Sequence, residues 1–204
     1  MRGDTIESCS SPIGFRLSSL LQQFVWVALF QTRPQDLPPG QIPMRIAIII
    51  NVVTYTVAVA SNRSIPNSLA LALTDMAISG LCLYMAVSVV DKRARFHQAF
   101  TALCGGTAVL NVAAMPVLWL SATTDPPSFS LLNLLIVFWG LAIIAHVLRH
   151  TLEVAPYISV GLALVFYLFV VQLLAITGVL GSEPQADQQL SIYQSLSVDW
   201  LSKG

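Results

Sequence analysis

The sequence predicts an all-α membrane protein in which five transmembrane helices follow an N-terminal amphipathic interfacial helix. Of its 204 residues, 55% are apolar and only 10% are charged, and the mean hydropathy is +0.74. Soluble domains are nearer a quarter charged. Five apolar runs are long enough to be spanning helices if the first one begins near Pro43 or Met44. The runs are 46–60, 66–90, 99–120, 129–148 and 156–180. Together they form a predicted transmembrane domain, 46–180.

The segment 1–45 is predicted to contain an amphipathic helix at 13–31 and a proline-rich hinge at 33–43. One face of this helix is apolar, and Arg16, Ser19 and Gln23 lie opposite it. The apolar face consists of Ile13, Leu17, Leu20, Leu21, Phe24 and Ala28. A helix of this kind lies in the membrane interface, and its apolar end allows it to dip into the acyl region. A sixth span is the alternative.

Charge placement predicts an orientation. All but one of the twenty charged residues lie outside the five runs, and eight of the ten basic residues fall in the N-terminal segment and the loops at 91–98 and 149–155. Basic residues are retained on the cytoplasmic side. We therefore expect a multi-pass protein of the bacterial inner membrane, with the N-terminus cytoplasmic and a polar tail, 181–204, in the periplasm. A sixth span would invert this assignment.

The sequence lacks the residues and motifs that several functional classes of protein require. The net charge is zero, which argues against nucleic-acid binding. The chain has no GxSxG, HExxH, Walker A or GxGxxG sequence, so we expect no enzyme and no catalytic residue. Cys9, Cys82 and Cys104 form no CxxC pair, and neither disulfides nor a bound cofactor are expected.

Asp75 is the one charged residue inside a predicted span. A carboxylate there costs ~2.5–3.5 kcal/mol unless it is paired, hydrated or protonated. Because no basic residue lies in any span, its partners should be neutral donors or water. The intramembrane polar candidates are Asn51 and Asn111, with Thr54, Tyr55, Thr74 and Ser79 as further neighbours. Asp75 is then either a proton or cation relay or a structural interhelical contact.

Two histidines, His146 and His150, lie four residues apart and so share one helix face, a spacing that metals can use. Two ligands are too few for a closed site, although His97 and Glu153 could add to them. The other interpretation is a polar helix end near the headgroups, and we expect no metal site. Four basic residues, Lys92, Arg93, Arg95 and Arg149, are predicted to contact lipid headgroups.

The third run carries a face of small residues, Ala102 and Gly106 with Gly105 beside them, which permits close helix approach. Such a face suits association with other integral membrane proteins or with a second copy. Isolated amides such as Asn133 and Gln172 suit interhelical hydrogen bonds.

The chain resembles the Yip1-domain family of small polytopic membrane proteins. The resemblance is carried by the Pro34–Pro38 segment before the first span, by Arg93-Ala-Arg-Phe-His-Gln-Ala-Phe-Thr-Ala-Leu at the start of the third, and by Trp139 to His150 in the fourth. It covers about residues 20–180 and leaves the tail unexplained. It implies five spans, a cytoplasmic N-terminus and a role exerted through partner proteins, and it transfers no catalytic residue.

Three functional hypotheses follow. The leading one is a non-enzymatic accessory or scaffold protein that acts by packing against other membrane proteins or itself. The second is a small ion-coupled transporter that uses Asp75. The third is a metal- or redox-cofactor-binding subunit that uses His146 and His150.

Overall fold

The structure, a computed structural model, describes residues 17–38, 40–61, 63–121 and 127–176. These residues form α-helices and two short 3₁₀ turns, with no β-strand among them. The elements are α1 (Leu17–Ala28), η1 (Pro34–Asp36), α2 (Gln41–Val59), α3 (Ile65–Val89), η2 (Arg93–Arg95), α4 (Phe96–Ser121), α5 (Pro127–Leu152) and α6 (Pro156–Ile176). In this part of the chain five helices, α2 to α6, are long and apolar enough to cross a membrane. The predicted fold class, with its N-terminal helix, is confirmed.

Some predicted features fall outside the described residues. These are the tail 181–204, Cys9, positions 13–16 of the N-terminal helix and the last four residues of the run 156–180.

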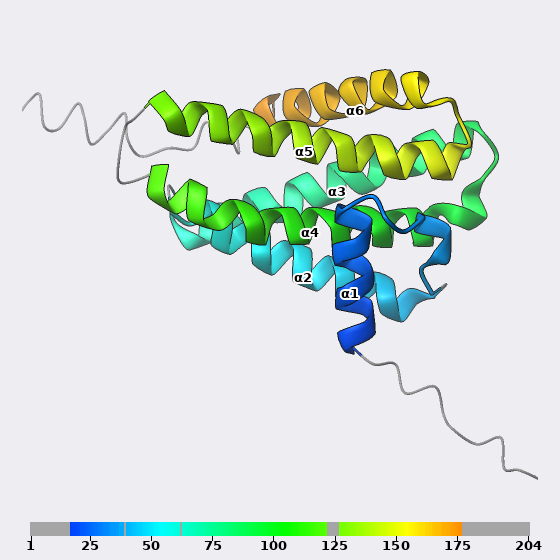
Figure 1. The fold of residues 1–204 in the computed structure, drawn as a ribbon, viewed down its shortest axis with the longest axis horizontal. Helices are drawn as coiled ribbons and strands as arrows, with labels where there is room; N and C mark the ends of the chain where they lie inside the picture. Colours follow the sequence, from blue (N-terminus) through cyan, green and yellow to red (C-terminus); the bar gives the residue numbers. More distant parts are fainter. Residues whose placement is uncertain (1–16, 39, 62, 122–126, 177–204) are drawn as a thin grey trace, which may run out of the picture.

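The five spanning helices form a closed ring whose order differs from the order of the sequence. α2 packs most extensively against α4, and α4 also packs against α5. α5 contacts α6, α6 contacts α3, and α3 returns to α2. The contact between α3 and α6 is the least extensive of the five. Figure 1 shows the five spans side by side with their axes roughly parallel.

The proline-rich hinge is shorter than predicted. α2 begins at Gln41, so Pro43 lies in its first turn. Proline is tolerated there because the first amides of a helix have no intrahelical acceptor. The hinge therefore ends at Gly40, whose φ of 150° is readily adopted only by glycine. The last three residues of the predicted hinge, 41–43, thus belong to α2.

The N-terminal helix also ends earlier than predicted, at Ala28 instead of residue 31. Phe30 adopts a left-handed conformation with φ of 60°. The Gln31 amide donates to the Trp26 carbonyl at 2.8 Å, and the Phe30 amide donates to the Val27 carbonyl at 3.0 Å. These two bonds form a Schellman-type end that satisfies the last carbonyls of α1.

α1 lies across the spans instead of beside them (Figure 1). Its twelve residues measure about 18 Å, well short of the ~30 Å hydrocarbon core. The described part of this helix is therefore not a sixth span. It contacts α4 at Gly105, about 14 Å along that helix from Phe96. α1 thus crosses the bundle within the length of the spans and not above their ends.

The faces of α1 differ in part from the prediction. Leu20, Phe24 and Ala28 are buried as expected, and Val27 joins them. Leu21, from the same predicted apolar face, is 42% exposed and does not join this packing. Gln23, predicted to lie on the outer face, is half-buried, and its Oε1 has no hydrogen-bond partner among the described residues. The reason is that α1 packs on α4 and also reaches α5, which widens the buried face on one side.

Candidate functional site

Asp75 lies near the middle of α3 and is half-buried. It lines a cavity of about 330 Å³ that is bounded by all five spanning helices. Cavities of this size are typical of small-molecule sites. Because α3 forms one wall of the helix ring, the Asp75 side chain can face the cavity at the centre of the ring.

Polar side chains gather on the walls formed by α2, α3 and α4. Besides Asp75, these are Asn51, Tyr55, Ser79, Thr107 and Asn111. The amide nitrogen Nδ2 of Asn111 donates to Oδ1 of Asn51 at 3.2 Å, and the Thr107 hydroxyl lies 3.1 Å from the same oxygen. The buried Asn51 is therefore held between two side chains of α4, which places a fixed polar group in the cavity wall.

Asp75 itself has no comparable partner. Within the described residues, the ion pairs are both made by Glu153 at one end of the bundle, and no hydrogen bond to the Asp75 carboxylate is found. Asn51 and Asn111, predicted as its neighbours, line the same cavity without bonding to it. The carboxylate is thus open to a ligand, a proton or water.

Thr74 and Thr54, two other predicted neighbours of Asp75, do not face the cavity. The Thr74 hydroxyl donates to the Ala70 carbonyl at 2.8 Å, and the Thr54 hydroxyl donates to the Ile50 carbonyl at 2.9 Å. Neither residue lines the cavity, and neither do Asn133 and Gln172. Threonine often bonds to the preceding turn of its own helix, so spacing alone could not separate these from Ser79.

Sequence reasoning missed the cavity residues of α6 and of the early part of α4. Tyr167 and Phe166 come from α6, and Phe100 and Thr107 come from α4. A tyrosine in the middle of an apolar run was the available signal, because its hydroxyl requires a polar neighbour.

Two of the three cysteines, Cys82 and Cys104, lie within the described residues. Cys82 and Cys104 are free, and Cys104 is buried in the cavity wall.

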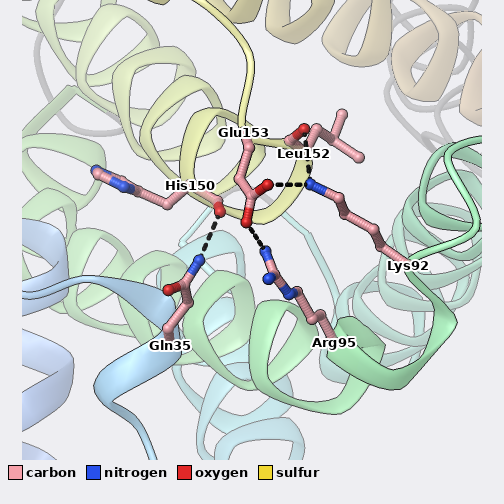
Figure 2. Close-up of polar contacts among 6 residues, drawn as sticks. All are labelled: Gln35, Lys92, Arg95, His150, Leu152 and Glu153. Carbon is pink, nitrogen blue, oxygen red and sulfur yellow. Dashed lines mark hydrogen bonds and ion pairs between the residues drawn. The ribbon is translucent and has the colours of Figure 1, made fainter.

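A second polar cluster lies at the end of the bundle where η1, η2 and the α5–α6 turn meet. Figure 2 shows Glu153 between Lys92 and Arg95. Lys92 Nζ donates to Glu153 Oε2 at 2.6 Å and to the Leu152 carbonyl at 3.3 Å, and Arg95 donates to Oε1. We call this group the Glu153 clasp. Hydrogen bonds from Lys92 and then Arg95 lower the pKa of Glu153 to about 2.

The clasp accounts for two of the four basic residues predicted to contact lipid. Lys92 and Arg95 bind Glu153, while Arg93 and Arg149 are exposed. The same end carries a hydrogen bond from Gln35 Nε2 to the His150 carbonyl at 3.0 Å (Figure 2). Gln35 of η1 and the two loops therefore lie at the same end of the bundle.

The structure uses His146 to hold the chain after α1. Its Nε2 lies 3.1 Å from the Thr32 carbonyl, and its ring contacts Phe30 edge-on. The His146 and His150 rings are 4.6 Å apart between centroids. No group of three or more His, Cys, Asp or Glu side chains able to hold a metal occurs in the described ranges. Of the added ligands considered, Glu153 is engaged in the clasp and His97 is exposed.

The small-residue face of α4 is covered by the chain itself. Any Cβ on Gly105 would overlap the Phe24 ring of α1, and one on Gly106 would lie 3.0 Å from Ile143 Cγ2 of α5. Ala102 is fully buried. This face therefore joins α4 to α1 and α5 within one molecule.

Comparison with protein-family models, curated proteins and solved structures gives no match to this chain.

Proposed function

We propose that the protein is a small ion-coupled membrane carrier that binds its solute in the central cavity, with Asp75 as the ion-coupling group. The observation that carries this proposal is the placement of Asp75. It is a lone carboxylate without an ion-pair partner among the described residues, and it faces a cavity of about 330 Å³. Ionisable groups inside a membrane bundle are costly and typically mark ion or substrate pathways.

The walls of the cavity support the same proposal. Asn51 and Asn111 supply hydrogen-bonding groups near the carboxylate, so a bound solute or ion meets more than one polar contact. α3, which carries Asp75, closes the ring with α6 through the least extensive of its five helix pairs. The α3–α6 contact is therefore the one in the ring that can open most easily when the charge state of Asp75 changes.

The test is gradient-driven flux in proteoliposomes containing the full chain. A pH or sodium gradient is imposed, and accumulation of a panel of labelled organic cations, neutral solutes and anions is followed. Wild type should accumulate at least one class, and Asp75→Asn should fall to the level of empty liposomes. Asp91→Asn is the matched control, because Asp91 is an exposed carboxylate at the end of α3 whose left-handed φ of 57° asparagine accepts.

Two results would remove the proposal. One is gradient-driven flux of a solute that Asp75→Asn leaves unchanged. The other is the absence of flux above empty liposomes for every solute and both gradients.

The accessory or scaffold hypothesis remains a prediction. One observation that favoured it, the small-residue face of α4, now supports it less. The small-residue face that suited a partner helix is occupied by α1 and α5.

We further propose a bacterial inner-membrane location with the Glu153 clasp on the cytoplasmic side, supported by the basic residues at that end. The Yip1-like resemblance agrees with this orientation and stays a hypothesis about ancestry.

A further inference from the structure

The cavity has two chemically different sides. Its polar groups come mainly from α2, α3 and α4, whereas α5 and α6 contribute a wall that is apolar except for Tyr167. The apolar residues of that wall are Ile136, Val137, Gly140, Ile144, Phe166, Val170, Val171 and Leu174. A ligand that fills the cavity therefore needs an apolar body and a polar group on one side.

The polar side of the cavity determines which sign of charge a ligand can carry. Asp75 is the only charged side chain that lines the described cavity, and the rest of its polar groups are neutral amides and hydroxyls. A buried carboxylate is stabilised by a cation brought into contact with it and destabilised by an anion. The cavity thus selects against anionic ligands.

Aromatic rings reinforce this selection. Tyr55, Phe100, Phe166 and Tyr167 line the cavity from three different helices. The face of an aromatic ring attracts a positive charge, most strongly where water is excluded. Aromatic walls also favour a cation that carries apolar groups over a small hydrated ion.

An inorganic cation fits the site less well. Calcium takes six to eight oxygen ligands, and magnesium requires near-octahedral oxygen geometry. The cavity offers one carboxylate and a few amides and hydroxyls on one side, facing an apolar wall. A sugar or another polyol would place hydroxyls without partners against the apolar wall of α5 and α6, and burying an unpaired hydroxyl is unfavourable.

We propose that the cavity binds a lipophilic organic monocation, such as a hydrophobic amine or quaternary cation. Its charge lies at Asp75 and its apolar groups pack against α5 and α6. This inference rests on the proposed carrier function, and it names the class of solute carried. No covalent step is involved.

The experiment measures direct binding to the full chain in phosphatidylcholine nanodiscs, with empty nanodiscs subtracted. The probes are tetraphenylphosphonium and tetraphenylborate, which have the same shape and opposite charge. Tetraphenylphosphonium should bind saturably and tetraphenylborate should not. Across tetramethyl-, tetraethyl- and tetrapropylammonium, affinity should rise with apolar surface at constant charge.

Variants locate the site. Asp75→Asn, which keeps the side-chain volume, should weaken tetraphenylphosphonium binding by at least about tenfold. Asp75→Glu should retain much of the affinity, and Asp91→Asn should match wild type. Size-exclusion profiles and helical content must be unchanged in each variant. The pair of isosteric probes tests the proposal on wild type alone, whatever the variants do.

The outcomes separate this inference from the carrier proposal. Equal binding of the two isosteric probes, or affinity independent of Asp75, would overturn the inference. Gradient-driven flux of a neutral or anionic solute without tetraphenylphosphonium binding would also overturn it and leave the carrier intact. Saturable, Asp75-dependent binding without flux of any solute would support the ligand class and remove the carrier.

Discussion

Asn51 and Asn111 are joined across α2 and α4 by a 3.2 Å hydrogen bond between residues sixty positions apart in the sequence. Thr107 approaches the same Asn51 oxygen from one turn earlier on α4. The most extensive helix pair of the bundle therefore includes a polar contact directly at the cavity.

Replacing Asn111 with alanine should lower the free energy of unfolding in mild detergent by about 0.6 kcal/mol, the average measured for interhelical hydrogen bonds in membranes, and by at most about 1.7 kcal/mol. Asn51→Ala should cost more, because it removes the acceptor for both Asn111 and Thr107. Reversible unfolding of the two single variants and the double variant measures the coupling between them. Additive losses would show that the two amides do not interact.

Adding one methyl group to Gly105 should loosen α1. A Cβ at this position overlaps the buried Phe24 ring, and overpacking of this kind costs about 1–3 kcal/mol. Gly105→Ala should therefore lower the melting temperature and speed proteolytic cleavage near α1. Gly161→Ala is the control, because nothing lies within 4 Å of a Cβ there. If the two variants melt alike, α1 does not pack on Gly105.

Removing the indole donor of Trp139 should release the end of α1. Its Nε1 donates to the Ala28 carbonyl at 3.0 Å. Trp139→Phe should cost about 1 kcal/mol and raise amide hydrogen exchange in the residues that follow Phe24. Trp119→Phe is matched to it, since Trp119 donates to the Val57 carbonyl on α2, away from α1. Faster exchange of α1 in both variants would contradict a local role for Trp139.

The Glu153 clasp should make stability depend on pH in acid. The pKa of Glu153 is lowered in the folded protein to about 2 from an ordinary 4.5, so the folded state favours the charged form. The stabilisation is present above pH 4.5 and is lost as the pH falls toward 2. Glu153→Gln should melt slightly lower than wild type at neutral pH, and the difference should vanish at low pH. High salt should also shrink it, because the carboxylate is exposed. A melting difference that persists unchanged at pH 2 would show that charge is not its cause.

Composition and charge predicted the spans well, because a hydrocarbon environment constrains every residue of a long apolar run. Asp75 stood out for the same reason. The depth and rotation of α1 could not be predicted, since they depend on the space left by Gly105 and on a hydrogen bond from Trp139 more than a hundred residues away. Nor could the sequence show that Lys92 and Arg95 meet Glu153 at one end of the bundle, because the α5–α6 turn lies far along the chain.

The order of helices in the ring also constrains how the protein is made. α2 emerges first among the spans, yet its main neighbour, α4, is synthesised only after α3. α3 borders α6, the last span, so the wall beside Asp75 is incomplete until the end of synthesis. A nascent chain interrupted before Pro156 would hold a carboxylate in the bilayer without its aromatic cover from α6.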